Sequence, residues 1–593
     1  MKKDNAGYYN IGLVMAGAVT AGAFTGGVIN YLLNTLELWE QEYQRFPDAT
    51  PKPNVRIETM TGASAGSIAA AVTLLSLVTK RNEEVLLDQP LDPEKSLQYY
   101  TWVDYGLENS DEIIEKIFST NDIRNEEVKS ILNTHFIDQL IEKLGKILND
   151  STHYKLPNYI RSDIEILMTL SNLRGVPLDL YFSNDASTAA HTMSYHKAYA
   201  YFQFNKKSSD ASTLKLDLRD KESLELFLNC ARASGAFPIG LRSVPFEKIP
   251  KDYIQANLQQ IFGEEICLEP RIEEDYKFLA VDGGMTNNEP IAEAIKILRR
   301  KKDSDDPVIM IDPFPNYLAN NEPNNDYDLK ADSLKDIIPQ LYHTLRNQVL
   351  FKEKDIAQLF DKDSDNKMIW PTRYNENGKA LRNPIATGAL GGFSGFFDKS
   401  FREHDFMLGM KNCQNFIRYY FSQDIDKAEN WASASAIDKF SFTDQFGNKK
   451  IPIIPDYRIT NREEATGAFL PRLREHHSFP SYPSVSQKEL INDRLKPVIK
   501  KRVQSVVSSL LKKQDGKDKT KPPYITQSEL SKGLLAKLIP RGIKNWFLKD
   551  QIVNATVPMI LDNISRYLYE HDLFNDVFPR PDTTLDQDED IVA

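Results

Sequence analysis

Residues 55–77 read VRIETMTGASAGSIAAAVTLLSL, and this stretch decides the expected fold. Its first residues, Val55–Met60, predict an apolar strand, and the alanine-rich residues after the glycines predict a buried helix. Between them Gly62 and Gly66 flank Ser64 in a GxSxG pattern, which holds a serine at a sharp strand-to-helix turn. A tight structural turn is the alternative for such a motif alone, and its place between a strand and a helix favours a nucleophile.

Two uncharged stretches, residues 11–36 and 59–79, resemble membrane spans in length. The first follows two lysines, as a signal peptide would. However, its five glycines and two asparagines would make a poor apolar helix. We therefore predict a strand over Tyr8–Met15, a glycine loop over Gly17–Gly22 and a buried helix over Phe24–Trp39. Without a signal peptide or a membrane span, the expected location is the cytoplasm.

The wider pattern predicts an α/β fold. Roughly the first 310 residues alternate strand-like and helix-like segments, which indicates a mainly parallel sheet covered by helices on both faces. The strand candidates are Ile11–Met15, Val55–Met60, Leu178–Ser183, Lys277–Val281 and Val308–Ile311, with Tyr195–Phe204 as an antiparallel edge. The longer helix candidates are Glu126–Asn149, Leu334–Leu359, Phe401–Phe421, Leu490–Lys513 and Val553–Glu570.

Composition narrows the class of protein. With 593 residues, 41% of them hydrophobic and 26% charged, the chain is neither disordered nor fibrous. A net charge of −11 argues against a general nucleic-acid binder. Three widely spaced cysteines argue against a disulfide framework or a zinc knuckle.

A serine nucleophile needs a base. His404, His476 and His477 lie in polar surroundings that predict a surface position. The better candidate is Asp282, which directly follows the predicted strand Lys277–Val281, where ligands gather in open parallel sheets. An Asp-Gly-Gly is usually only a turn, but a carboxylate within reach of the serine hydroxyl could take its proton directly.

The glycine loop reads Gly17-Ala18-Val19-Thr20-Ala21-Gly22. It lacks the glycine spacing of a dinucleotide fingerprint and the Lys-Ser/Thr ending of a phosphate-binding loop. Its backbone N–H groups could face an oxyanion, and the alternative is packing of small residues at a tight turn.

Glycine loop, GxSxG and Asp-Gly-Gly, in this order, resemble the patatin-like phospholipases. That family comprises α/β/α serine lipid acyl hydrolases that use a Ser–Asp dyad and no catalytic histidine. The resemblance covers about residues 8–312, and Ala231–Pro238 is similar to the family's Ala-Ser-x-Ala-x-Pro segment. It implies that Ser64 is the nucleophile and Asp282 the dyad acid, the latter followed by a motif formed by Gly283 and Gly284.

The resemblance also implies an oxyanion hole at Gly17, Ala18 and Val19. Here this sequence departs from the family, because Ala18 and Val19 occupy the second and third positions of its glycine triplet. Backbone donors do not depend on side chains, so the hole can survive. Valine does not readily adopt positive φ, so a differently shaped or weaker hole is the alternative.

From these features we expect a serine esterase acting on phospholipids or other acyl lipids, without cofactor or metal. An inactive binding protein with the same fold and an acyltransferase with the same dyad are the alternatives. The expected division is a hydrolase domain over residues 1–425 and a mostly helical region over residues 426–593.

One segment is strongly basic. Residues 496–549 hold 14 lysines and arginines against three acidic residues, whereas an acidic tail ends the chain. Within residues 530–550 the cations alternate with leucine, isoleucine, tryptophan and phenylalanine, which is the composition of a helix on an anionic membrane surface. An amphipathic helix packed on the hydrolase domain is the alternative.

Overall fold

The structure is a computed structural model of the chain. The residues that it describes are 8–48, 50–79, 92–123, 127–149, 156–180, 191–207, 211–262, 272–301, 306–314, 366–374, 380–381, 383–428, 437, 440–444, 446–457, 479–515 and 545–576.

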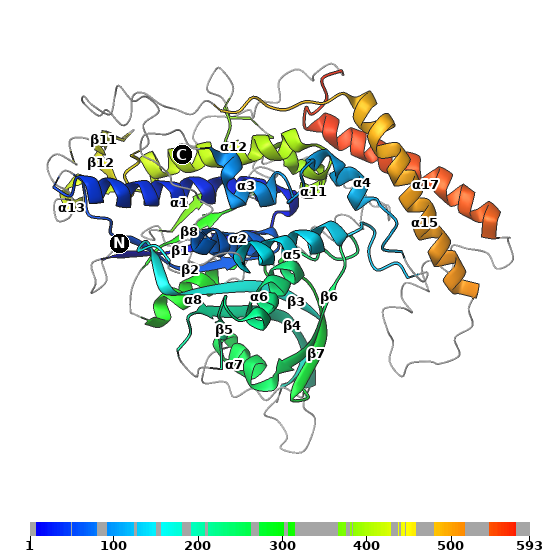
Figure 1. Ribbon diagram of the computed structural model, residues 1–593, viewed down its shortest axis with the longest axis horizontal. Helices are drawn as coiled ribbons and strands as arrows, with labels where there is room; N and C mark the ends of the chain where they lie inside the picture. Colours follow the sequence, from blue (N-terminus) through cyan, green and yellow to red (C-terminus); the bar gives the residue numbers. More distant parts are fainter. Residues whose placement is uncertain are drawn as a thin grey trace.

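A nine-stranded sheet forms the centre of the molecule (Figure 1). Its strands are β1 (Tyr9–Met15), β2 (Val55–Gly62), β3 (Ile160–Leu180), β4 (His191–Phe204), β5 (Leu214–Leu216), β6 (Val244–Pro250), β7 (Asp275–Asp282), β8 (Val308–Ile311) and β9 (Lys367–Ile369). They follow the order β5-β4-β3-β2-β1-β8-β9, and β7 lies between β3 and β6. Neighbouring strands from β3 through β2, β1 and β8 to β9 run parallel, whereas β4, β6 and β7 form antiparallel pairs.

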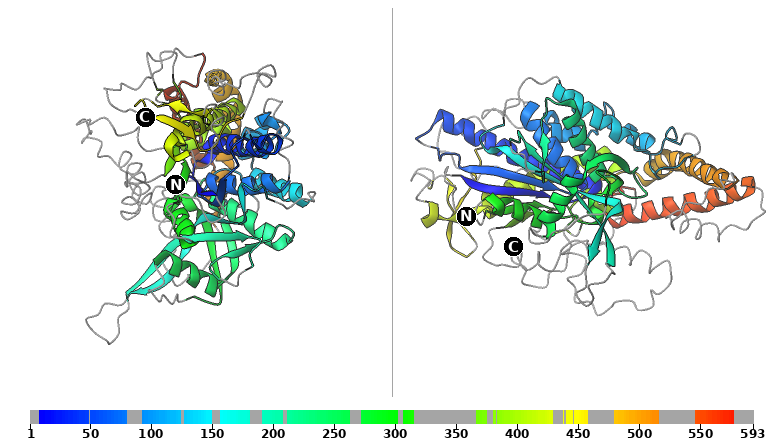
Figure 2. Two further views of the ribbon diagram at one scale, coloured as in Figure 1. Left: turned by 90° about the vertical axis from the view of Figure 1, so that its left-hand side faces the viewer. Right: turned by 90° about the horizontal axis from the view of Figure 1, so that it is seen from below.

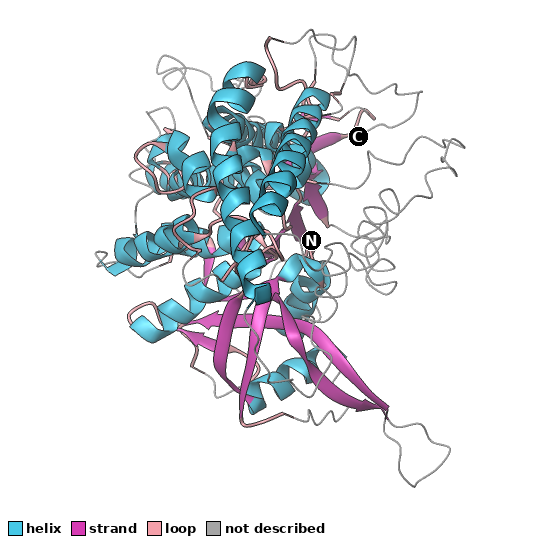
Figure 3. Ribbon diagram, turned by 90° about the vertical axis from the view of Figure 1, so that its right-hand side faces the viewer, coloured by secondary structure: helices cyan, strands magenta, loops and turns pink. Residues whose placement is uncertain are grey.

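Helices cover both faces of the sheet, which confirms the predicted α/β/α class. The alternation along β1 shows why: Leu13 and Met15 join the core beneath α1 (Gly22–Arg45) and α2 (Ala65–Thr79), while Val14 faces the opposite side. On that opposite side Val14 packs against α8 (Ile291–Lys301). A strand buried on both faces must be apolar throughout, so the uncharged stretches belong to this core. Figure 3 shows the strands of this sheet in one twisted layer with the larger group of helices above them. A separate three-stranded sheet is formed by β10 (Ser422–Asp424), β12 (Lys449–Pro452) and β11 (Phe442–Thr443), in that order.

The helix α1 lies directly against α12 (Lys399–Asn415) (Figure 1). An ideal Cβ on Gly27 would lie 1.9 Å from the backbone oxygen of Phe406, and one on Gly409 would lie 2.2 Å from the backbone oxygen of Phe24. Only glycine permits this approach. Gly27, one of the glycines that argued against a membrane helix, therefore serves close helix packing.

The C-terminal helices form a second hydrophobic cluster. They are η8 (Lys488–Leu495), α15 (Lys496–Asp515) and α17 (Asn545–Glu570), and the last two lie side by side at one end of the molecule (Figure 1). Their apolar residues pack with Phe396 and Phe401, close to the start of α12. The C-terminal region is thereby joined to the main body.

Several segments differ from the sequence-based expectation. The strand β3 is far longer than Leu178–Ser183, because its charged residues are paired: Glu165, for example, is buried and binds Arg300 at 2.7 Å. Figure 2 shows the far ends of β3 and β4 extending beyond the rest of the sheet. The strand β4 is antiparallel to β3 as predicted, but β5 pairs with its other side, so β4 is not an edge.

The predicted helices are confirmed in part. The helix α5 (His135–Asn149) begins nine residues later than predicted, since the Asn133 side chain accepts the His135 N–H at 2.9 Å and caps it there. The predicted helices over Phe401–Phe421, Leu490–Lys513 and Val553–Glu570 are present. The predicted helix Leu334–Leu359 lies outside the described residues.

None of the described helices, α1 and α2 included, combines the length and the hydropathy of a transmembrane span. The membrane-surface helix was predicted over residues 530–550. Residues 530–544 lie outside the described part of the chain, and residues 545–550 begin α17.

Candidate active site

Two strands of opposite direction end at the same place. The strand β2 runs parallel to β3 and ends with Gly62 opposite Met168, whereas β7 runs antiparallel to β3 and ends with Asp282 opposite Leu170. Because β4 occupies the other side of β3 here, β2 and β7 lie on the same side and their carboxyl ends face each other. This topology brings together two residues 218 positions apart in the sequence.

The two residues are Ser64 and Asp282. Ser64 Oγ donates a hydrogen bond to Asp282 Oδ2 at 2.6 Å, and the two residues are only 6% and 4% exposed. The other carboxylate oxygen, Oδ1, accepts the N–H of Gly284 at 2.7 Å. Hydrogen bonds to both oxygens fix the carboxylate in orientation, so Asp282 presents an acceptor to the serine hydroxyl.

The backbone at Ser64 is strained, with φ at +51°. Such a conformation costs a non-glycine residue about 1–3 kcal/mol and persists only where its surroundings enforce it. The flanking glycines are part of that enclosure: an ideal Cβ on Gly66 would lie 2.0 Å from the Met15 carbonyl oxygen, and one on Gly62 would lie 2.5 Å from the Gly66 carbonyl. The GxSxG pattern is therefore required by close packing of backbone on backbone.

A series of hydrogen bonds through two serine hydroxyl groups holds the turn at Ser64. The Ser64 N–H donates to Ser234 Oγ at 2.9 Å, Ser234 Oγ donates to Ser67 Oγ at 2.7 Å, and Ser67 Oγ donates to the Gly62 carbonyl at 2.8 Å. Ser234 lies at the end of α6 (Lys221–Ser234). Sequence reasoning gave Ser234 no role, although its membership of the Ala231–Pro238 block marked it.

We expect Ser234→Ala to lower the free energy of unfolding by about 1–3 kcal/mol, because it leaves the buried Ser64 N–H without an acceptor. Urea denaturation measures this loss. The matched control, Ser194→Ala on the exposed surface of β4, is expected to change stability by less than about 0.5 kcal/mol. Equal stability of the two variants would contradict a supporting role for Ser234.

The glycine loop lies against the nucleophile. An ideal Cβ on Gly17 would lie 3.0 Å from the Cβ of Ser64 and 2.2 Å from Asn288 Oδ1. The Gly17 N–H donates to the Asn288 carbonyl at 3.2 Å, so this N–H already has an acceptor. The N–H groups of Ala18 and Val19 have no hydrogen-bond acceptor within the described part of the chain.

Val19 adopts the left-handed backbone conformation that a β-branched side chain disfavours, with φ at +49°. A second strained segment, α11 (Ala389–Gly392), packs on it: Thr20 Oγ1 donates to the Gly392 carbonyl, and Gly392 itself has φ at +97°. An ideal Cβ on Gly392 would lie 3.2 Å from the Cβ of Val19. Contacts from this distant segment thus surround the valine. Sequence reasoning missed α11, although its glycines were a signal.

Apolar side chains lie close to the dyad. The backbone N–H of Asp282 donates to the Ala236 carbonyl at 2.9 Å, and the next residue, Phe237, packs edge-on against Phe393 with ring centroids 5.5 Å apart. Ile239 follows with 75% of its surface exposed, and its carbonyl accepts the N–H of Ile131, which is also exposed. An apolar rim thus begins next to the residue that binds the Asp282 backbone, and it is formed by Phe237, Phe393, Ile239 and Ile131.

The surface position predicted for His404 is wrong. His404 is 4% exposed on α12, and its Nδ1 lies 2.7 Å from Asp405 Oδ1. The prediction was based on the charged residues beside His404, but these are buried with hydrogen-bond partners of their own. Asp405 accepts the N–H groups of Ala386 and Thr387, and buried Arg402 donates to backbone carbonyls. His476 and His477 lie outside the described residues.

Comparison with known proteins agrees with this arrangement. Residues 13–295, which include the glycine loop, Ser64 and Asp282, match the family model of the patatin-like phospholipases. An uncharacterized protein, y4iI, of Sinorhizobium fredii (strain NBRC 101917 / NGR234) is 27% identical over 513 residues, covering 75% of this chain and 70% of that protein. The crystal structure of VipD from Legionella pneumophila aligns over 98% of this chain and 95% of its own at 12% identity, with a TM-score of 0.20, too low to compare the two folds. The family match thus assigns a patatin-like phospholipase domain to residues 13–295 of this chain.

Proposed function

We propose that this protein is a serine lipid acyl hydrolase of the phospholipase A or lysophospholipase type, with Ser64 as nucleophile and Asp282 as its base. The observation that carries the proposal is the 2.6 Å hydrogen bond from Ser64 Oγ to Asp282 Oδ2 between two buried side chains. A nucleophile within hydrogen-bond reach of a base that a third group orients is the usual arrangement for acyl transfer. Here the Gly284 N–H orients the base.

In the first half of the reaction, Asp282 accepts the Ser64 proton while Oγ attacks the ester carbonyl carbon. The carbonyl oxygen becomes an oxyanion, and we assign the N–H groups of Ala18 and Val19 as its donors. Their freedom from other acceptors among the described residues supports this assignment. When the carbon–oxygen ester bond breaks, Asp282 returns the proton to the leaving alcohol, and the acyl group stays on Ser64.

In the second half, Asp282 takes a proton from water, and the resulting hydroxide attacks the acyl carbonyl. When the tetrahedral intermediate formed by this attack collapses, the bond to Oγ breaks, Asp282 returns the proton to Oγ, and the fatty acid leaves. The same carboxylate therefore acts as base twice. Its burial supports this role, because a carboxylate removed from water is a stronger hydrogen-bond acceptor.

The apolar rim supports a lipid as the substrate. Ile131 and Ile239 are exposed, and transfer of such apolar side chains from water into lipid is favourable. They would therefore help the protein to contact a membrane from which a lipid substrate is taken. Peripheral docking through residues 530–550, whose cations alternate with apolar residues, is part of the proposal and adds attraction to anionic lipid.

We further propose that residues 1–425 act as the hydrolase domain and residues 426–593 as a supporting helical region. Phe396, four residues beyond α11, belongs to the hydrophobic cluster formed with α15 and α17. The C-terminal helices thus contact the segment that packs on Val19 and Thr20, so their removal is expected to loosen the oxyanion loop.

Incubation with phosphatidylcholine vesicles tests the proposed reaction. The wild-type protein is expected to release fatty acid, and Ser64→Ala is expected to release it about 10³-fold more slowly or not at all. Addition of an acceptor alcohol separates hydrolysis from transfer, since an acyltransferase would form the new ester in preference to the acid. A folded wild-type protein that forms neither product would contradict an enzymatic function.

A further inference from the structure

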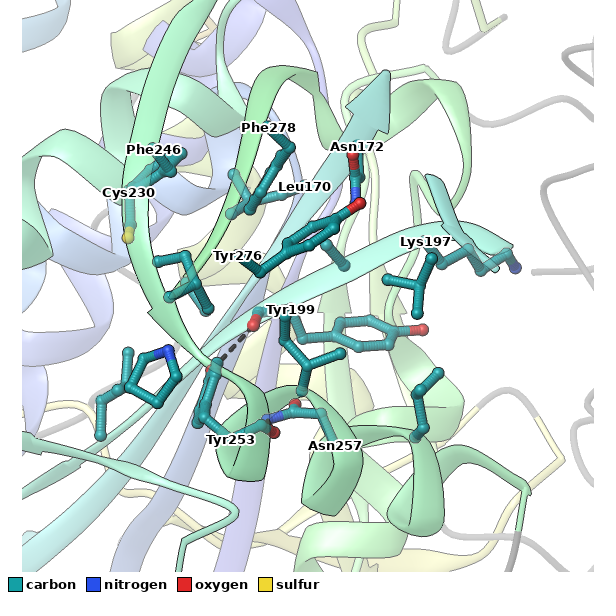
Figure 4. Close-up of a pocket in the computed structure, with 18 of the residues that line it drawn as sticks. Leu170, Asn172, Lys197, Tyr199, Cys230, Phe246, Tyr253, Asn257, Tyr276 and Phe278 are labelled. Atoms are coloured by element: carbon teal, nitrogen blue, oxygen red, sulfur yellow. Dashed lines mark hydrogen bonds between the residues drawn. The ribbon is translucent and has the colours of Figure 1, made fainter. Parts of the chain in front are cut away.

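A cavity that contains neither Ser64 nor Asp282 lies within the hydrolase domain (Figure 4). Its volume is about 140 Å³, and its walls come from β3, β4, β5, α6, β6, β7 and α7 (Lys251–Phe262). The aromatic and aliphatic residues of these walls include Leu170, Phe246, Tyr253, Tyr276 and Phe278. A cavity of this size with apolar walls favours an apolar ligand over water.

The polar atoms of the walls are already satisfied. The Tyr253 hydroxyl donates to the Tyr199 carbonyl at 2.8 Å, as Figure 4 shows, and the Tyr276 hydroxyl donates to the Gly175 carbonyl at 2.6 Å. Burial also raises the pKa of the Cys230 thiol, which stays neutral. These groups therefore present carbon and sulfur, rather than unpaired donors, to the interior.

Charge is found only at the margin of the cavity. Of the described residues that line it, Lys197 and Lys248 alone are charged, and both are cationic. Lys248 is exposed, Lys197 is half-buried, and Figure 4 places Lys197 at one edge of the cavity. An apolar interior with cations at its margin is complementary to an amphiphile with one chain and an anionic head group.

The cavity adjoins the elements that hold the dyad. Side chains alternate along a strand, so Phe278 in the cavity wall and Asp282 lie on the same face of β7. Residues four apart share one face of a helix, so Cys230 in the wall and Ser234, which binds the Ser64 N–H, lie on the same face of α6. A ligand in this cavity would therefore contact the two elements that end at the dyad.

We propose that this cavity is a binding site for a fatty acid of about twelve carbons, with the chain among the aromatic residues and the carboxylate at Lys248 on the margin. The site is distinct from Ser64 and goes beyond the proposed hydrolysis. It binds the free acid whether or not the protein cleaves esters.

Calorimetric titration of Ser64→Ala protein with dodecanoate, below its micellar concentration, tests this site without turnover. Saturable binding of one dodecanoate per chain is expected. Ala198→Trp, which fills the cavity, is expected to weaken binding at least tenfold, whereas Ala211→Trp, which adds the same side chain at an exposed loop, is expected to leave it unchanged.

A second variant remains informative if Ala198→Trp fails to fold. Lys248→Glu alters an exposed side chain and is expected to weaken dodecanoate binding about tenfold while leaving dodecanol binding unchanged. Absence of saturable dodecanoate binding to the folded protein would overturn the proposal. Equal effects of Lys248→Glu on acid and alcohol would overturn the assignment of the carboxylate to Lys248.

Discussion

Replacement of Asp282 by asparagine is expected to lower kcat for ester hydrolysis by about 10²–10⁴-fold, the range that a positioned general base contributes. Asparagine has nearly the same shape and can still accept the Gly284 N–H. It cannot take the Ser64 proton, because the side-chain amide is not a base. Its oxygen only accepts a hydrogen bond, and its nitrogen only donates one. The fold is therefore expected to survive while proton transfer fails.

Steady-state hydrolysis of a soluble ester by the variant measures this effect, with thermal unfolding as a check of the fold. Asp312→Asn is the matched control, since Asp312 also follows a core strand, is buried and accepts a backbone N–H, that of Phe314, at 2.8 Å. Its kcat is expected to stay within about threefold of the wild-type value. A kcat for Asp282→Asn as high as that of this control would exclude Asp282 as the base.

Gly66→Ala is expected to destabilise the protein by about 3 kcal/mol or more, at the upper end of what overpacking costs. The added methyl group would lie 2.0 Å from the Met15 carbonyl oxygen, and both partners are backbone groups of the central core. Neither can move without displacing β1 or the turn that carries Ser64. Loss of stability and loss of activity are therefore expected together.

Gly145→Ala provides the opposite case. Gly145 lies inside α5, where a Cβ would meet only Leu228 Cδ1, at 3.6 Å. Alanine is the better helix former, so this change is expected to stabilise the protein by about 0.5–1 kcal/mol. Chemical denaturation of both variants gives the comparison. A Gly66→Ala protein as stable as Gly145→Ala would show that the backbone contact at Met15 is not tight.

The parts of the fold that follow from local pattern could be predicted from the sequence. Short, largely apolar segments between glycines and polar loops made β1, β2 and β8 visible, and the small residues around Ser64 indicated the turn. The strand β3 was largely missed because Glu165 interrupts its apolar pattern. Its partner Arg300 is 135 positions away, a distance over which no local pattern carries information.

In the candidate site, too, the residues marked by local pattern were predicted and those that depend on distant contacts were not. Ser64 and Asp282 were predicted as partners because each follows a strand, and the structure brings them to 2.6 Å. Ser234 and α11 received no role, since their contacts with Ser64 and Val19 depend on tertiary packing across at least 170 residues. The conformation of Val19 was equally inaccessible: local preference disfavours it, and distant contacts surround it.

The most direct test of the central claim is labelling of the purified protein with a fluorophosphonate, followed by intact mass measurement and peptide mapping. An activated serine beside a base is expected to give a single adduct on Ser64, absent from Ser64→Ala and strongly reduced in Asp282→Asn. An adduct on another residue, or none on a folded wild-type protein, would contradict the assignment of Ser64 and Asp282 as a catalytic dyad.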